Sequence, residues 1–268
     1  MIIHWNIHPE IFNIGFLSVR WYGLLFASSF LIGSFIGSWI FKRENKPQES
    51  LDRILIYMLL GTVIGARLGE CLFYNPAYYL ANPLEIFKIW KGGLASHGAG
   101  VGLFISTLIY SRRTPGQSYI WILDRGCIVV ALSGCFIRMG NLFNSEIIGK
   151  PTNASWGFVF ERIDDIPRHP TQLYESFIYL LIFLILITIY RNMDLDKVPG
   201  LLIGPFLILI FGARLGVEFL KENQAEFESG LILNMGQFLS IPMILVGVFV
   251  LVRITLPALL KLPQGSYK

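Results

Sequence analysis

The fold class is decided by residues 172–190, which read QLYESFIYLLIFLILITIY. Beyond Glu175 this stretch has no charged side chain, and its length is close to the about 20 apolar residues that an α-helix needs to cross a bilayer. Comparable runs lie at roughly 16–41, 51–73, 94–111, 119–137, 199–219 and 236–260. The pattern predicts a bundle of about seven transmembrane helices.

The composition places the whole chain in the membrane class. Of its 268 residues, 54% are hydrophobic and only 15% are charged, and the mean hydropathy is +0.58. A soluble protein of this size needs more polar surface. The net charge of +4 does not indicate a nucleic-acid partner, because the basic residues stand in short clusters between apolar runs, as in membrane proteins. We expect one all-α integral membrane domain over residues 1–268, surrounded by membrane lipids.

Neither the cysteines nor the other potential ligands indicate a bound group. Cys71, Cys127 and Cys135 all lie within apolar segments, and an odd, unpaired set argues against a disulfide framework or a zinc site. The histidines and carboxylates also lack metal-ligand spacing. We therefore expect no metal and no cofactor. The first residues lack the cationic region of a signal peptide, so we expect the first apolar run to remain in the mature protein.

Lysine and arginine in the connecting segments predict the orientation of the helices. The longer connections, at roughly 74–93 and 139–171, hold few basic residues and are rich in Tyr, Trp and Phe, as expected for outer segments at the lipid headgroups. We expect an outer N-terminus and a cytoplasmic C-terminus. The inner connections and the C-terminal tail then hold Lys42, Arg43, Lys46, Arg112, Arg113, Arg191, Lys197, Lys261 and Lys268.

The second predicted helix has glycines at every fourth position, namely Gly61, Gly65 and Gly69. Small residues at this spacing let two membrane helices approach closely. We therefore expect a tightly packed helix bundle.

Ionisable and polar side chains gather at the outer ends of the predicted helices. A charged side chain at the bilayer centre costs about 2.5–3.5 kcal/mol on insertion scales, so such residues are expected to face the bundle interior and to act there. The pattern predicts a polar cavity that opens toward the outer leaflet. Its residues are Tyr22, Arg67, Glu70, His97, Arg138, Arg214 and Glu218.

The 138–149 stretch is the most informative one for function. It reads RMGNLFNSEIIG and contains the guanidinium of Arg138, the carboxamides of Asn141 and Asn144, and the carboxylate of Glu146. These groups stand where a hydrophobic helix leaves the bilayer. Polar groups at such a place indicate a polar substrate.

Each of these residues also has a purely structural interpretation. Arg67 and Glu70 have the i,i+3 spacing of an ion pair within one helix, and Arg214 has a carboxylate four residues later. Tyr22 has the position of an interfacial aromatic residue, and His97 that of a histidine bonded to backbone at a helix start. The two asparagines above would then only cap turns.

A series of short motifs occurs in order along nearly the whole chain. They are RWYG at 20–23, ARLG at 66–69, FYNP at 73–76, GGLASHG at 92–98, the 138–149 stretch, RHPTQLYE at 168–175 and RLGVEF at 214–219. Together they resemble the prolipoprotein diacylglyceryl transferase family of bacteria. The resemblance implies seven spans and an active site that faces outward.

The chain departs from the family pattern at three positions. Ile137 stands where a glycine precedes the signature arginine, and Leu142 where a phenylalanine follows the first asparagine. Ala99 replaces the second glycine after His97. No functional group is lost, so these departures concern the backbone geometry around Arg138 and His97, and hence the rate or the lipid preference, more than the reaction.

The resemblance also implies the reaction. A diacylglyceryl group passes from phosphatidylglycerol to the thiol of the lipobox cysteine in the signal peptide of a prolipoprotein, a thioether forms, and glycerol phosphate leaves. This first step of lipoprotein maturation takes place in the bacterial cytoplasmic (inner) membrane, on the periplasmic side. The nucleophile belongs to the substrate, so no Ser-His-Asp set is needed.

The roles that the resemblance implies agree with the chemistry of the side chains. A guanidinium holds phosphate oxygens by two parallel bonds and keeps its charge when poorly hydrated, so Arg138 is expected to bind the headgroup, with Asn141 orienting it. Arg214 is expected to contact the same phosphate or the leaving-group charge. His97 is the candidate base for the thiol, and a thiolate stabilised by the arginines is the alternative.

The remaining expected site residues support these groups. Glu146 and Glu218 are expected to position the arginines. Tyr22 is expected to donate a hydrogen bond to the headgroup, and Gly149 to permit a turn. Asn144 is expected to contribute to phosphatidylglycerol binding.

Two other classes of protein are alternatives. A transporter or channel also concentrates polar groups in a membrane cavity, but it should show them through the midplane, often with internal repeats. The inner halves of the predicted helices here are nearly uncharged. A non-catalytic lipid-binding or scaffold protein would need the basic and aromatic outer segments, but not His97 together with two buried arginines.

Overall fold

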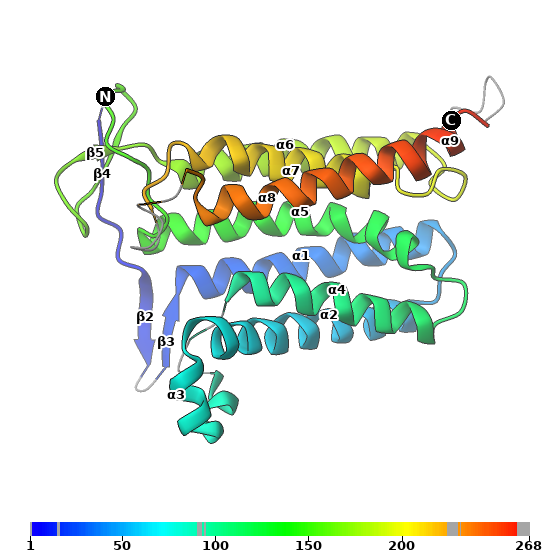
Figure 1. Ribbon diagram of the computed structural model, residues 1–268, viewed down its shortest axis with the longest axis horizontal. Coiled ribbons are helices and arrows are strands. Elements are labelled where there is room, and N and C mark those ends of the chain that lie inside the picture. Colours follow the sequence, from blue (N-terminus) through cyan, green and yellow to red (C-terminus); the bar gives the residue numbers. More distant parts are fainter. Residues whose placement is uncertain are drawn as a thin grey trace. The chain divides into compact units, whose positions relative to one another are not determined.

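The computed structural model describes residues 2–14, 17–89, 93, 95–223, 230 and 232–261, without the side chains of residues 14, 17, 96 and 97. This part of the chain is mostly helical (Figure 1). Its longer helices are α1 (Trp21–Arg43), α2 (Gln48–Gly69), α4 (Ser96–Arg113), α5 (Tyr119–Asn144), α6 (Thr171–Asn192), α7 (Ile203–Glu218) and α8 (Met235–Val250). Shorter helical segments are Glu70–Tyr74, α3 (Pro76–Ala81), Pro83–Phe87, Leu251–Thr255 and α9 (Leu256–Leu259).

A helix lies at each range that the sequence predicts to span the membrane. Among the described residues, 5 helical stretches are long and apolar enough to cross a bilayer, which confirms a mostly helical membrane protein. The helices α4 and α7, with 18 and 16 residues, lie at the other two ranges. The 5 stretches are Trp21–Arg43, Gln48–Tyr74, Tyr119–Asn144, Thr171–Asn192 and Met235–Leu259.

Short strands, which the all-α prediction did not include, accompany the helices. β1 (Ile3–Trp5) pairs in parallel with β4 (Phe158–Phe160), and β4 pairs antiparallel with β5 (Pro167–Arg168). β2 (Glu10–Ile14) and β3 (Leu17–Arg20) form an antiparallel pair ahead of α1. Backbone N–H and C=O groups outside a helix need other partners, and these ladders provide them.

The chain divides into two compact units. The first unit comprises residues 1–36 and 123–268, and the second comprises residues 37–122. In the second unit, α2 and α4 approach closely, since a Cβ on Gly102 would lie 2.0 Å from the carbonyl oxygen of Gly61. Only a residue without a side chain allows this approach. The close packing predicted from the glycines of α2 is confirmed.

In the first unit, α5 anchors the start of α7. The buried carboxylate of Asp124 accepts a hydrogen bond from the backbone N–H of Gly200 at 2.7 Å. It also accepts from the N–H groups of Leu202 and Ile203, at 3.1 and 2.9 Å. The first N–H groups of a helix have no partner within the helix, and a carboxylate there also interacts favourably with the helix dipole. The start of the helix that carries Arg214 is therefore fixed.

The helix α5 ends later than predicted. It continues to Asn144 instead of ending near residue 137, because apolar side chains of its last turns pack against other parts of the first unit. Leu142 packs in a buried cluster with the phenylalanines of β4. Phe143 stacks on Trp21, with ring centroids 4.9 Å apart. The indole of Trp5 donates to the carbonyl oxygen of Leu142 at 3.0 Å, which gives a partner to one of the last carbonyl groups of the helix.

Candidate active site

The 138–149 stretch is partly helix and partly turn. Arg138 and Asn141 lie on one face of α5 because they are three residues apart, and Nη1 of Arg138 donates to Oδ1 of Asn141 at 3.1 Å. The chain then turns at Ser145 and Ile147, each with a φ of 55°. The residues that follow α5 thereby return toward its last turn.

The carboxylate of Glu146 joins the two asparagines of this stretch. Nδ2 of Asn141 donates to Oε2 of Glu146 at 3.3 Å, and Nδ2 of Asn144 donates to Oε1 at 3.1 Å. The half-buried Tyr22 packs beside them, since a Cβ on Gly140 would lie 2.7 Å from its ring. The guanidinium, the carboxamides and the carboxylate of the motif therefore form one connected row.

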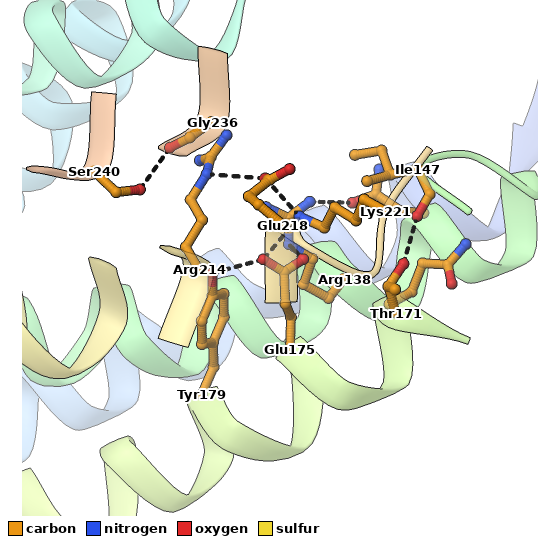
Figure 2. Close-up of polar contacts among 12 residues, drawn as sticks. Arg138, Ile147, Thr171, Glu175, Tyr179, Arg214, Glu218, Lys221, Gly236 and Ser240 are labelled. Atoms are coloured by element: carbon orange, nitrogen blue, oxygen red, sulfur yellow. Dashed lines mark hydrogen bonds and ion pairs between the residues drawn. The ribbon is translucent and has the colours of Figure 1, made fainter. Parts of the chain in front are cut away.

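Five charged side chains of the first unit meet in a buried cluster (Figure 2). Nε of Arg138 lies 2.9 Å from Oε2 of Glu175, without the geometry of a hydrogen bond. Nζ of Lys221 donates to Oε1 of Glu175 at 3.0 Å and to Oε1 of Glu218 at 2.8 Å. Nε of Arg214 lies 3.5 Å from the same Glu218 oxygen. We call these five residues the ion cluster.

The ion cluster has more positive than negative charge. Three cations and two carboxylates leave a net charge of +1. The side chains of Glu175, Glu218 and Lys221 are 0%, 2% and 1% exposed, whereas those of Arg138 and Arg214 are 12% and 25% exposed. The guanidiniums are therefore the accessible part of the cluster. Because an uncompensated charge is unfavourable in a buried place, the cluster is suited to an anionic ligand.

Arg214 has spare hydrogen-bonding capacity. Its Nε contact with Glu218 does not satisfy the geometry of a hydrogen bond. Within the described part of the chain, its terminal Nη groups make no hydrogen bond either. A guanidinium binds carboxylate or phosphate oxygens through such a planar pair of donors. Arg214 is thus placed to bind an anion.

Buried polar atoms without a hydrogen-bond partner gather around the same place. They belong to residues where α5 and α7 end and where α6 and α8 begin. Most buried polar atoms in proteins have a partner, so this concentration indicates a site for a polar molecule. Among the described residues they are Asn144 Oδ1, Ser145 Oγ, Gln172 Oε1, Glu175 Oε2, Arg214 Nε and Gln237 Nε2.

The start of α8 packs against the Glu218 carboxylate. Nδ2 of Asn234 donates to Oε2 of Glu218 at 3.1 Å, while Oδ1 of Asn234 accepts from the backbone N–H of Gln237 at 2.9 Å and caps α8. A Cβ on Gly236 would lie 2.4 Å from Oε1 of Glu218. Glu218 is therefore held by contacts that do not depend on Arg214.

Arg168 fixes the long connection between α5 and α6. Its guanidinium contacts Asp164 at 2.6 Å and Glu222 at 2.7 Å, and it donates to the carbonyl oxygen of Gly149 at 3.3 Å. The hydrogen bond from Arg168 holds the pKa of Asp164 below its ordinary value of 3.8. The same bond raises the pKa of Arg168. This side chain thus ties two parts of the connection, at Gly149 and Asp164, to the segment that follows α7, at Glu222.

Comparisons with known proteins show the family. The family model for prolipoprotein diacylglyceryl transferase matches residues 9–253. The chain is 49% identical over 249 residues to the phosphatidylglycerol–prolipoprotein diacylglyceryl transferase of Chloroherpeton thalassium, a match that covers 93% of each chain. It is 47% identical over 247 residues to the protein of the same name from Tolumonas auensis, covering 92% of this chain and 95% of that one. The chain belongs to the prolipoprotein diacylglyceryl transferase family.

Membership of the prolipoprotein diacylglyceryl transferase family confirms the resemblance from which the site residues were chosen. Most of these residues lie in the first unit, in the connected row and the ion cluster that share Arg138. His97 belongs to the second unit, where its backbone is in the first turn of α4. The side chain of His97 lies outside the described residues, so its role as a base stays a prediction.

Two carboxylates lie near the Arg138 guanidinium, and only one of them was expected from the sequence. Glu146 is predicted to position the arginines, and within the described residues its hydrogen-bonded link to Arg138 runs through Asn141. The carboxylate at the guanidinium belongs to Glu175. The packing of α6 against α5 brings Glu175 to this place, and the sequence analysis did not include it.

Gly149 also differs from its prediction. The turns of positive φ are at Ser145 and Ile147, and the φ of Gly149 is not positive. Gly149 instead forms a β-bridge with Lys221, and a Cβ there would lie 2.4 Å from the carbonyl oxygen of His169. The prediction that Gly149 permits a turn is wrong, and close backbone approach is the reason for the glycine.

Arg67 has a structural role in the second unit. Its guanidinium donates to the carbonyl oxygens of Glu85 and Ile86, at 2.5 and 2.8 Å, and to that of Gly93 at 3.0 Å. It also lies over the ring of Tyr79, 5.0 Å from the centroid. Arg67 therefore holds the segment that follows α3 against the end of α2.

Four residues of the site were not predicted from the sequence. They are Glu175, Lys221, Tyr179, which donates to Glu175 at 3.4 Å, and Gln172, which donates to the carbonyl oxygen of Glu146 at 2.6 Å. A signal for Glu175 was present, because an ionisable residue within an apolar membrane helix is presumed to be functional. Lys221 had no such signal, since it follows α7 in a polar segment.

Proposed function

We propose that this chain transfers the diacylglyceryl group of phosphatidylglycerol to the lipobox cysteine of prolipoprotein signal peptides. The cysteine sulfur displaces the phosphate from a glycerol carbon, a thioether forms, and glycerol phosphate leaves. Family membership and the names of the relatives support this first step of lipoprotein maturation. The substrate supplies the nucleophile, so the protein has to bind, orient and stabilise charge.

The ion cluster is the observation that carries this proposal. Phosphatidylglycerol has an anionic phosphodiester, and its phosphate gains further negative charge as the bond to carbon breaks. The cluster offers a net charge of +1, and within the described residues the Nη groups of Arg214 make no hydrogen bond. Guanidiniums that are fixed before the reaction stabilise such charge without reorganisation.

We assign Arg138 and Arg214 to the lipid phosphate and its leaving group. The Asn141–Glu146 row lies next to Arg138, where its carboxamide and carboxylate suit the hydroxyl groups of the headgroup glycerol. Asn144 belongs to the same row, and Tyr22 beside it is assigned a hydrogen bond to the headgroup.

The cysteine must lose its proton to attack. Its unperturbed pKa is about 8.5, so a thiolate has to be generated or stabilised at the site. We assign His97 as the base, because an imidazole titrates near neutral pH. A thiolate stabilised directly by the arginines is the alternative.

The seven longer helices are proposed to form one membrane domain in the bacterial cytoplasmic membrane. We place the N-terminus and the site on the periplasmic side and the C-terminus in the cytoplasm. The basic residues in the last turns of α1 and α4 support this orientation. The exposed apolar side chains of Phe73, Leu80, Leu84 and Phe87 suit a connection that lies at the lipid headgroups.

Mass spectrometry of a lipobox peptide, incubated with the purified protein and phosphatidylglycerol, tests the proposal. We expect a diacylglyceryl thioether on the cysteine with the parent protein. Arg138→Ala should lower the rate by about 100-fold or more, the effect of removing one pre-organised donor from a developing anion. Arg53→Ala, at an exposed position of α2, is the matched control and should retain the parent rate.

The same experiment has outcomes that contradict the proposal. A well-folded parent protein that forms no thioether would refute the transfer and favour transport or scaffolding. Parent-like rates from Arg138→Ala would remove the phosphate-binding role from the ion cluster.

A further inference from the structure

Lys221 lies outside every sequence motif, yet it is the most enclosed cation of the ion cluster, with 1% of its side chain exposed. Its backbone is fixed by a bridge to Gly149. On either side of this bridge, the N–H of Lys150 donates to the carbonyl oxygen of Leu220 at 2.7 Å, and the N–H of Glu222 donates to that of Ile148 at 3.1 Å. The backbone therefore determines where the lysine side chain starts.

The ammonium group of Lys221 joins two carboxylates from different helices. It donates to Glu175 of α6 at 3.0 Å and to Glu218 of α7 at 2.8 Å. Each of these carboxylates also faces an arginine, Glu175 facing Arg138 and Glu218 facing Arg214. Lys221 is thus the link between the two arginine–carboxylate pairs (Figure 2).

The charge of the cluster depends on this lysine. With Lys221, three cations and two carboxylates leave +1; without it, two guanidiniums and two carboxylates leave zero. Glu175 and Glu218 would then have only the arginines as cationic partners within the cluster. Both guanidiniums would be drawn further toward the carboxylates and away from an anionic ligand.

We propose that Lys221 is a positioning residue for lipid-phosphate binding. By neutralising part of the charge on Glu175 and Glu218, it lets these carboxylates hold Arg138 and Arg214 in place without cancelling their charge. The inference rests on the proposed function of the site. This role differs from that of a purely structural salt bridge. A positioning role predicts that the affinity for an anion follows the net charge of the cluster, even where the stability of the fold is unchanged.

The test compares Lys221→Met, Lys221→Arg and the double variant Lys221→Met with Glu218→Gln. Binding of phosphatidylglycerol to the detergent-solubilised protein is measured by native mass spectrometry, and KM and kcat by thioether formation on a lipobox peptide. Lys221→Met should weaken lipid binding and raise KM by about tenfold, the scale of one unit charge removed near a partly buried anion. Lys221→Arg should stay within about threefold of the parent.

The double variant separates charge from structure. It removes one cation and one carboxylate, so the net charge returns to +1. Because Glu218 also holds Arg214 in place, lipid affinity should not reach that of the parent, but it should rise clearly above that of Lys221→Met. A double variant that binds as weakly as Lys221→Met would overturn the inference, because a lost structural link is not restored by a second deletion. Unchanged affinity in a folded Lys221→Met would overturn it as well.

Folding and function are controlled separately. Lys197→Met removes an exposed lysine from an ion pair with Asp194 and should leave lipid binding unchanged. If Lys221→Met does not fold, Glu218→Gln and the double variant decide the question. Both lack Glu218, and the double variant, with one positive charge fewer, should bind the lipid about tenfold more weakly; equal affinities would overturn the inference. A parent protein that binds phosphatidylglycerol but forms no thioether would refute the proposed transfer, while the comparison of lipid affinities would still decide the role of Lys221.

Discussion

Individual side chains determine which anion the site is able to bind. An arginine presents a planar fork of donors that matches phosphate oxygens, whereas a lysine is a compact point charge. The ion cluster uses both types in different places: the arginines are the accessible cations, and Lys221 is enclosed between carboxylates. This division assigns ligand binding to the guanidiniums and internal neutralisation to the ammonium.

Arg214→Lys tests whether ligand binding requires a guanidinium at the residue whose Nη groups make no hydrogen bond within the described part of the chain. The substitution keeps the charge but removes the fork, so we expect kcat/KM for phosphatidylglycerol to fall by roughly 10- to 100-fold. Steady-state thioether formation measures it, with Arg53→Lys on the exposed surface of α2 as the matched control. A parent-like kcat/KM would show that charge alone is sufficient at this position.

The residue types of the site are predictable from the sequence, but their pairing is not. Arg138 and Arg214 stood out because ionisable residues within membrane helices are rare and are presumed to be functional. The contact of Lys221 with Glu175 joins residues 46 positions apart, and no local pattern encodes such a contact. For the same reason, Glu175 was not among the predicted site residues.

At the scale of secondary-structure elements, local hydrophobicity was sufficient for the helices. Each predicted range contains a helix because crossing a bilayer requires a continuous apolar run. The strands were missed because β1 and β4 have 3 residues each and pair across most of the chain. The end of α5 was placed too early, since contacts with β4 and Trp21 extend the helix.

The glycine contact between α2 and α4 leads to a prediction about stability. Gly102→Ala puts a Cβ 2.0 Å from a backbone oxygen of Gly61, so the helices must separate, and we expect a loss of about 1–3 kcal/mol, as in overpacked cores. Gly100→Ala is the matched control in the same helix, because a Cβ there has nothing within 4 Å. Reversible unfolding in detergent measures both variants. Equal stability of the two would contradict the close packing.

For the whole molecule, the acid stability of the fold depends in part on the connection between α5 and α6. Arg168 lowers the pKa of Asp164 below 3.8 in the folded protein. A carboxyl whose folded pKa is depressed contributes stability above its unfolded pKa, and the contribution is lost as the pH falls through the folded value. This contribution is therefore present at neutral pH and disappears below about pH 3.8.

Asp164→Asn should reveal this contribution. We expect the variant to be less stable than the parent near neutral pH and the two stabilities to converge as the pH falls below 3.8. Unfolding midpoints measured over this pH range test the expectation. Asp165→Asn, at the exposed neighbouring position, is the matched control. A difference between parent and Asp164→Asn that does not change with pH would contradict the assignment.

The sequence by itself determined the membrane class, the positions of the helices and the presence of arginines suited to an anionic substrate. These properties depend on local hydrophobicity and on the chemistry of single side chains. Only the tertiary structure decided that Glu175 and Lys221 belong to the site, that Ser145 and Ile147 make its turn, and that unpaired buried atoms gather there. Those properties depend on distances between groups far apart in the chain, which form only when the helices pack.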